Sequence, residues 1–239
     1  LRLQSIRSGL HLREAYQLIA GIDKDLEQSL PYAFDHELGY LTACPTNVGT
    51  GLRASAMLHL PGLVISDHIG QVIQAVGKLG LAVRGIFGEG TESLGHLFQI
   101  SNQSTLGESE EDILNRLERV IQRVREQERN ARSKLLEEDP QMLADKISRA
   151  YGQLKYAYVI DSKEALTHIS LVRLGSDMGC FPKEAMKLCD SLLMDIEPAH
   201  LQHQADRKLS PEERDTMRAE IIRSRLQNLS SPVINFITS

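Results

Sequence analysis

The stretch 39–55, GYLTACPTNVGTGLRAS, combines reactive side chains with residues that let the backbone turn tightly. Cys44 offers a thiol and Arg53 a guanidinium, and Gly49 and Gly51 lie between them in the chain. Glycine adopts backbone conformations that other residues avoid, so this segment can bend sharply. Three interpretations are open: a phosphate-binding loop, the site of a nucleophilic cysteine, or a tight turn between two strands.

A glycine-rich phosphate loop is the weakest of these interpretations. Residues 49–54, GTGLRA, match the dinucleotide pattern G-x-G-x-x-A, but that pattern works only where a helix opens at its end. Here the following residues alternate in polarity and soon reach Pro61. A Walker loop is excluded because no Gly-Lys-Ser/Thr follows.

Arginines on strands provide a second way to bind phosphate. Arg2, Arg53 and Arg84 all lie in segments that read as strands. A guanidinium keeps its charge and forks onto phosphate oxygens with two donors, and a strand fixes its direction. Each arginine taken singly is equally well explained as an exposed surface residue.

The order of the elements predicts an α+β fold, a large and mostly antiparallel sheet flanked by helices. Ser210, Pro211 and Glu213 mark the start of the last helix as N-cap, first position and capping box. The periodicity predicts strands at 1–6, 39–44, 52–60, 81–85, 96–101 and 156–160, helices at 10–30, 62–78, 108–137, 141–154, 162–174 and 183–195, and a polar linker at 198–209.

Composition narrows the class of protein. The net charge of −5 argues against direct nucleic-acid binding or an anionic membrane surface, and no apolar run approaches the roughly 18 residues that span a bilayer. Three scattered cysteines indicate a reducing compartment, for which we expect the cytoplasm. His200 and His203 lack further ligands at metal spacing, so no protein-bound metal is predicted.

Two long segments resemble signatures of the guanidino kinases. YLTACPTNVGTGLRAS is similar to the signature around the reactive cysteine of that family, and VRGIFGEGTESLGHLFQISNQSTLG to its second signature. Gly90 stands where small-substrate members usually have histidine, and RDTMRA at 214–219 resembles the RDxxRA motif of bacterial McsB-type protein-arginine kinases. The resemblance covers essentially the whole chain.

The resemblance implies a guanido kinase catalytic domain with a glutamine-synthetase-like fold over residues 1–197. Residues 198–239 would form a helical segment that carries the phosphoarginine-binding motif. The sequence resembles the C-terminal two-thirds of such an enzyme. By this resemblance the first lobe and one of two catalytic carboxylates would precede Leu1, and the fragment alone is expected to be inactive.

The resemblance also assigns roles to residues. Glu89 would align the substrate guanidinium and accept its proton, Cys44 would sit beside it as a thiolate, and Arg53 and Arg84 would clamp phosphates. For Cys44 the alternative is a small buried hydrophobic residue. The nucleotide contacts implied are Arg2, Arg53, Ala54, Ser55, Ala56, Met57, Arg84, Gly85, Ile86, Phe87, Gly88 and Glu89, and the regulatory phosphoarginine contacts are Arg214, Asp215, Thr216, Met217, Arg218 and Ala219.

The implied function is ATP-dependent phosphorylation of arginine residues in proteins, with Mg²⁺ carried by the nucleotide. Implied partners are a CtsR-type heat-shock repressor and misfolded proteins as substrates, a McsA-type activator, and a Clp-type unfoldase–protease; a homodimer is also allowed. Two alternatives stay open: a phosphagen kinase that acts on free arginine or another small guanidine, and a non-catalytic phosphoarginine-binding adaptor.

Overall fold

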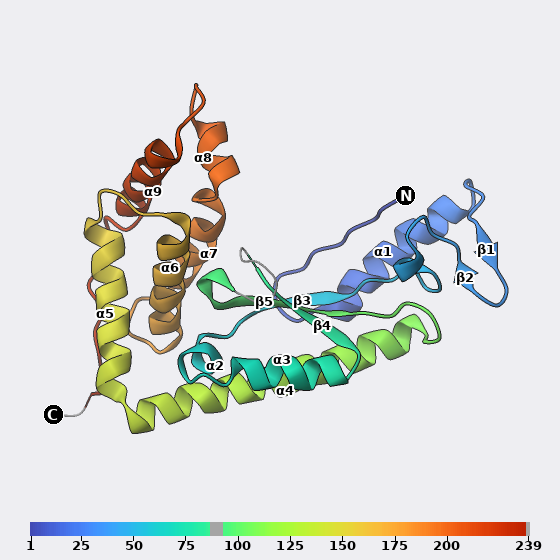
Figure 1. Cartoon of the computed structure of the whole chain (residues 1–239), viewed down its shortest axis with the longest axis horizontal. Helices are drawn as coiled ribbons and strands as arrows, with labels where there is room; N and C mark the ends of the chain where they lie inside the picture. The colour runs from blue at the N-terminus through green and yellow to red at the C-terminus, as the bar shows by residue number, and fades with distance from the viewer. Residues whose placement is uncertain (87–92, 238–239) are drawn as a thin grey trace. The chain divides into compact units, whose positions relative to one another are not determined.

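The computed structural model describes residues 1–86 and 93–237, which form helices and two small sheets (Figure 1). The chain divides into two compact units. Unit 1 comprises Leu1–Leu58, His68–Arg84 and Phe98–Gln127, and unit 2 comprises His59–Asp67, Gly85–Leu97 and Glu128–Ser239.

Unit 1 carries most of the sheet structure. Strands β3, β4 and β5 form a three-stranded sheet in the order β3-β5-β4, and β1 pairs with β2 in a short antiparallel ribbon. Its elements are α1 Leu12–Glu27, β1 Phe34–Asp35, β2 Gly39–Tyr40, the 3-10 turn η1 Pro45–Asn47, β3 Ser55–His59, α3 Ile69–Lys78, β4 Leu81–Gly85, β5 Leu97–Asn102 and the first part of α4 Glu110–Glu138.

Hydrogen bonds at the strand ends give the direction of each pair in this sheet. Asn102 N–H donates to the Ala54 carbonyl and Leu60 N–H to the His96 carbonyl, so β3 and β5 are antiparallel. Ile86 N–H donates to the Leu97 carbonyl, which joins the end of β4 to the start of β5. Because the end of β4 lies beside the start of β5, these two neighbouring strands can pair along their length only if they are antiparallel as well. The α+β class is therefore confirmed. The described residues form two small sheets, of three and two strands, in place of the large sheet that we expected.

Helix α4 covers unit 1 with the apolar stripe that its periodicity predicts. Ile113, Leu117, Val120, Ile121 and Val124 are all buried. They recur at the helical period, so one face of α4 leaves water while the charged faces stay in it. Strand β5 contributes Phe98 and Ile100 to the buried residues of the same unit.

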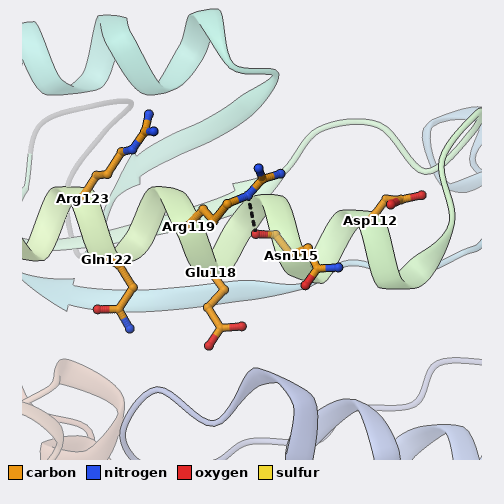
Figure 2. A pocket seen from close by; sticks show the side chains of 6 residues that line it. All are labelled: Asp112, Asn115, Glu118, Arg119, Gln122 and Arg123. Carbon is orange, nitrogen blue, oxygen red and sulfur yellow. Dashed lines mark hydrogen bonds between the residues drawn. The ribbon is translucent and has the colours of Figure 1, made fainter.

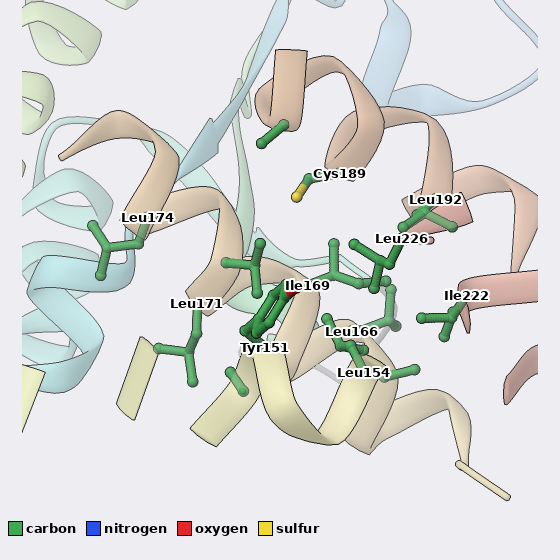
Figure 3. Packing of buried hydrophobic residues seen from close by; sticks show 14 of the residues in the cluster. Tyr151, Leu154, Leu166, Ile169, Leu171, Leu174, Cys189, Leu192, Ile222 and Leu226 are labelled. Atoms are coloured by element: carbon green, nitrogen blue, oxygen red, sulfur yellow. The ribbon is translucent and has the colours of Figure 1, made fainter. Parts of the chain in front are cut away.

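Unit 2 is helical and has a continuous apolar core (Figure 3). Tyr151 and Leu154 from α5, Leu166 and Ile169 from α6, and Leu192 from α7 lie in this core. A Cβ on Gly175 would lie 2.7 Å from Ile147 Cγ2, so the absence of a side chain lets α5 and α6 approach. The helices are α2 Pro61–Ile65, α5 Pro140–Tyr156, α6 Ser162–Asp177, α7 Glu184–Asp195, α8 Pro198–Gln204 and α9 Pro211–Arg225, with the 3-10 turn η2 Leu94–His96.

The start of α9 confirms the predicted cap. Ser210 Oγ accepts a hydrogen bond from Glu213 N–H, the Glu213 carboxylate accepts one from Ser210 N–H, and Pro211 occupies the first helical position. The predicted boundary between residues 197 and 198 stays a prediction.

Two predicted strands are wrong, and of the strand expected over 39–44 only β2, Gly39–Tyr40, forms. Residues 1–6 have no regular secondary structure, because an alternating segment becomes a strand only where another strand supplies its ladder bonds. Residues 157–160 form a loop whose backbone bonds to α9 instead: Ile160 N–H donates to the Asp215 carbonyl, and the Ala157 carbonyl accepts from Arg223.

Two predicted helical boundaries also differ. The helix expected over 62–78 is two helices, α2 and α3, separated by a turn in which Asp67 has φ of 59°. The segment 198–209, expected to be a linker, contains α8, whose Leu201 is fully buried. The polar composition of this segment predicted a linker, but a helix with one buried side chain, Leu201, forms there.

A buried carboxylate joins α4 to α2. Glu128 is 4% exposed and accepts hydrogen bonds from the Gly62 and Leu63 N–H groups, each at 2.9 Å. Arg132 Nε lies 2.5 Å from Glu128 Oε1, and Arg132 Nη1 donates to Asp177 Oδ2 at 2.9 Å. The carboxylate thus satisfies donors at the start of a helix that offers no capping side chain of its own.

A serine between two histidines forms a second buried polar cluster in unit 2. Ser170 Oγ lies 2.7 Å from His59 Nε2 and 2.6 Å from His96 Nδ1, and Ser170 is 2% exposed. Burial, with the charges of Arg173 and Arg132 nearby, holds the pKa of His59 well below its usual value. Burial and the charge of Lys146 lower the pKa of His96 to about 4. Both imidazoles are therefore neutral near pH 7.

We expect Glu128→Ala to lower the free energy of unfolding by about 3 kcal/mol, because it leaves Arg132 and two backbone donors without their buried acceptor. Urea unfolding followed by circular dichroism measures the change. Glu126→Ala, at an exposed position of the same helix, is the control. Equal stability of the two variants would contradict the capping role of Glu128.

We expect the stability of the chain to fall as the pH drops from about 6.5 to about 4. In this window the unfolded chain binds a proton at His96 that the folded chain rejects, which costs at most about 3 kcal/mol of stability. Asparagine does not titrate and tolerates the positive φ of His96, so His96→Asn should make the decline shallower. Urea unfolding across this pH range checks the slope, and identical slopes would contradict the account.

Candidate active site

Cys44 lies in a loop that is closed by backbone hydrogen bonds between Tyr40 and Gly49. Tyr40 and Gly49 exchange two hydrogen bonds, of 2.8 Å and 3.2 Å, and the turn η1 follows Cys44 directly. The Cys44 side chain is exposed, and its Sγ lies 3.0 Å from Thr46 Oγ1. Hydrogen bonds from the Thr46 hydroxyl and N–H lower the pKa of the Cys44 thiol. The alternative of a buried hydrophobic cysteine therefore fails for Cys44, whereas Cys180 and Cys189 are buried.

Gly49 brings the Cys44 loop against the chain that follows β5. Its φ is 108°, and a Cβ there would lie 2.2 Å from the Thr105 carbonyl oxygen and 2.8 Å from Leu106 Cα. Both the conformation and the space exclude a side chain. The glycines of the sequence pattern thus serve backbone packing between two segments.

Arg53 and Arg84 lie on one face of the three-stranded sheet. The antiparallel register aligns Met57 with Gln99 on β5, and Gln99 with Arg84 on β4, and residues at alternate positions of a strand share a face. Arg53 lies two residues before β3 and four before Met57. The bond from Asn102 N–H to the Ala54 carbonyl continues the pairing with β5 there, so Arg53 falls on this face. The hydrogen bond from Arg53 Nη2 to Ser101 Oγ, at 3.5 Å, agrees with this register. Arg53 and Arg84 are both exposed.

The other predicted nucleotide contacts divide into three groups. Ser55, Ala56 and Met57 lie on β3 beside the buried Ala54, Gly85 ends β4, and Ile86 follows it. Arg2 lies in the irregular segment before α1, outside both sheets. The catalytic candidate Glu89, with Phe87 and Gly88, lies outside the described residues.

Three polar residues that sequence reasoning did not single out lie buried beside this site. Ser101, Asn102 and Thr105 are 2%, 3% and 5% exposed. They occur where the apolar residues of β5 give way to the run SNQST. A cluster of small polar side chains directly after a buried strand is a signal for backbone-directed hydrogen bonding.

The RDTMRA segment forms the first turns of α9, where Arg218 is almost completely buried. Its guanidinium donates to the Ile196 carbonyl at 3.2 Å and the Ile160 carbonyl at 2.9 Å, and it pairs with Asp215 at 2.5 Å. Ala219 is buried beside it, whereas Arg214, Asp215 and Met217 are half-buried and Thr216 is exposed. Arg218 therefore holds three segments together in this structure.

The cavity in Figure 2 lies along α4, has a volume of about 660 Å³ and involves none of the predicted site residues. Its lining residues are Asp112, Asn115, Glu118, Arg119, Gln122 and Arg123. Among residues 1–86 and 93–237, no group of three or more His, Cys, Asp or Glu side chains could hold a metal ion. No helix in these ranges is long and apolar enough to cross a membrane.

Comparison with known proteins decides the family. A family model described as ATP:guanido phosphotransferase, C-terminal catalytic domain, matches residues 1–131, more than half of the chain. The chain belongs to the ATP:guanido phosphotransferase family. A second model, described as protein-arginine kinase McsB C-terminal domain, matches residues 140–236. The resemblance seen in the two signatures and in RDTMRA is confirmed.

Curated members of this family include bacterial protein-arginine kinases. The chain is 51% identical to the protein-arginine kinase of Brevibacillus brevis, over 97% of this chain and 65% of that protein. It is 52% identical to that of Syntrophomonas wolfei, over 95% of this chain and 63% of that protein. The chain thus spans slightly less than two thirds of these relatives. Among solved structures, a lombricine kinase is 30% identical with a TM-score of 0.42, over 51% of this chain and 33% of that one.

We expect Thr46→Val to raise the pKa of Cys44, because it removes the hydroxyl that donates to the thiolate. Alkylation by iodoacetamide proceeds through the thiolate, so its rate at pH 7 should fall. Rates measured across pH, with the labelled peptide identified by mass spectrometry, give the pKa directly. Thr46→Ser is the matched control and should keep the rate of the unmodified chain. An unchanged pKa in Thr46→Val would refute this assignment.

Proposed function

We propose that the protein is an ATP-dependent protein-arginine kinase. The observation that carries the proposal is the shared sheet face of Arg53 and Arg84, with the Cys44 loop directly before Arg53 in the chain. Fixed cations suit the oxygens of a phosphoryl group in transfer, and an exposed thiolate suits a substrate guanidinium. The relatives called protein-arginine kinases support the choice of a protein substrate.

The chemistry needs a guanidinium nitrogen to act as a nucleophile. Protonated guanidinium is a poor nucleophile because its pKa lies above about 12 and its lone pairs are delocalised. In this proposal Glu89 aligns the guanidinium and accepts its proton, and the Cys44 thiolate stabilises its charge from the side. Arg53 and Arg84 balance the charge on the transferred group, so that positioning and electrostatics supply the catalysis.

The described residues fit ATP as the phosphate donor. Arg53 and Arg84 offer two exposed guanidinium groups on one face, and Ser55 adds a hydroxyl to it. Bidentate donors of this kind recognise phosphate oxygens. Mg²⁺ would arrive with the nucleotide, since magnesium binds through substrate phosphates more than through dedicated protein cages.

The C-terminal segment is proposed as a phosphoarginine-binding regulatory region. Arg218 is occupied by two backbone carbonyls and Asp215, so its first role is to hold α9. Arg214 and Asp215 are both partly exposed on the first turns of that helix. A guanidinium for phosphate and a carboxylate for guanidinium match the two ends of phosphoarginine.

The proposed setting is the bacterial cytoplasm and its protein quality control. Substrates would be a CtsR-type repressor and misfolded proteins with exposed arginine, and a McsA-type activator and a Clp-type unfoldase–protease would be partners. A homodimer is compatible with this role.

The decisive experiment incubates the full-length protein with ATP·Mg and either a protein substrate or free arginine. We expect phosphoarginine on the protein and little on free arginine; the reverse would favour the phosphagen kinase alternative. Glu89→Gln removes the proposed base but keeps the shape of the side chain, so turnover should fall by 10² to 10⁴, roughly what general-base catalysis contributes. Full function of Glu89→Gln would favour the adaptor alternative.

A further inference from the structure

Resting on the proposed function, we propose that Asn102 and Thr105 are positioning residues that hold Arg53 and the Cys44 loop in place for phosphoryl transfer. Both lie in the segment at the end of β5, three residues apart. Asn102 bonds to the backbone around Arg53, and Thr105 bonds to the backbone of the turn after Cys44. One short segment therefore fixes the positions of Arg53 and the Cys44 loop relative to each other.

Asn102 fixes the peptide groups on both sides of Arg53. Its Oδ1 accepts from Ala54 N–H at 2.8 Å, and its Nδ2 donates to the Leu52 carbonyl at 2.9 Å. The second Nδ2 proton reaches the Ser104 carbonyl at 2.9 Å. Only a side-chain amide offers an acceptor and two donors in this arrangement, and all three are used. With Leu52 and Ala54 both held, the direction of Arg53 from the sheet is determined.

Thr105 fixes the turn that carries Cys44. Its hydroxyl lies 2.7 Å from the carbonyl of Val48, which follows η1, and 3.1 Å from the carbonyl of Thr46, the middle residue of η1. Its own carbonyl accepts from Thr50 N–H at 2.8 Å and lies against Gly49. Thr46 is the residue whose hydroxyl and N–H contact the Cys44 sulfur. Thr105 thus acts on the thiol through the backbone of Thr46.

The first test measures Cys44 alkylation against pH in Thr105→Val and Thr105→Ser. Valine keeps the shape of threonine but lacks the hydroxyl, and serine restores the hydroxyl. We expect Thr105→Val to move the alkylation profile to higher pH, with about a tenfold slower rate at neutral pH for each unit of rise in the pKa. Thr105→Ser should keep the original profile. Identical profiles for the two variants would overturn the role of Thr105.

The same experiment reports whether unit 2 stays folded, and circular dichroism of each variant reports the folding of the whole chain, including unit 1, which holds Thr105. Cys180 and Cys189 are buried, so they label only if unit 2 opens, whereas a change confined to the loop alters Cys44 alone. If valine prevents folding, Thr105→Ala makes the same comparison with serine. Because alkylation requires no kinase activity, this test stands even if the proposed function fails.

The second test uses transfer kinetics of Asn102→Asp in the full-length protein. Aspartate keeps the acceptor and loses both donors, so the Leu52 and Ser104 carbonyls would face an acceptor. We expect kcat/KM to fall by about 10²-fold through the misplacement of Arg53. Asn130→Asp, the same chemical change at an exposed position of α4, should leave kcat/KM near that of the unmodified protein.

The outcomes separate the two proposals. If the unmodified protein shows no transfer activity, the kinase proposal is wrong. The role of Thr105 is then decided by the alkylation experiment alone. If the protein is active and Asn102→Asp has the same kcat/KM as Asn130→Asp, the positioning role of Asn102 is wrong and the kinase proposal stands.

Discussion

The close approach of two backbones at Gly49 is the constraint on which the candidate site depends. A Cβ at this position would lie 2.2 Å from the Thr105 carbonyl, so the Cys44 loop and the end of β5 meet without a side chain between them. That contact lets the Thr105 hydroxyl reach the turn and lets the Thr50 N–H find an acceptor. The exposed thiol is therefore carried by a loop whose backbone is tied to a buried segment.

Buried polar side chains in both units satisfy backbone groups more often than they pair with each other. Asn102 in unit 1 bonds three backbone groups, and Glu128 in unit 2 caps two N–H groups of α2. Arg218 donates to two carbonyls, one of them in the loop that follows α5. A buried polar group without a partner is costly, so each of these residues holds one particular arrangement of distant segments. The apolar cores supply burial but do not by themselves select that arrangement.

Much of the fold follows from periodicity along the chain. The stripe of α4 and the capping box at Ser210 are local patterns, and the structure confirms both. The strand expected over 1–6 and the linker expected over 198–209 are wrong because their outcome depends on partners far away in sequence. A strand requires a neighbouring strand, and α8 packs against α7 and α9 with its Leu201 buried.

The sequence by itself determined the family, the helices of strong period and the residue types able to perform phosphoryl transfer. These are properties of contiguous segments: two long signatures, a helical repeat, a thiol and charged guanidinium groups. Only the tertiary structure decided that Arg53 and Arg84 share a sheet face, that Arg218 is buried, and that Asn102 and Thr105 bond to the backbone around Arg53 and after Cys44. The physical reason is that strand register, burial and hydrogen-bond partners belong to pairs of segments distant in the chain, and no local pattern encodes which segments meet.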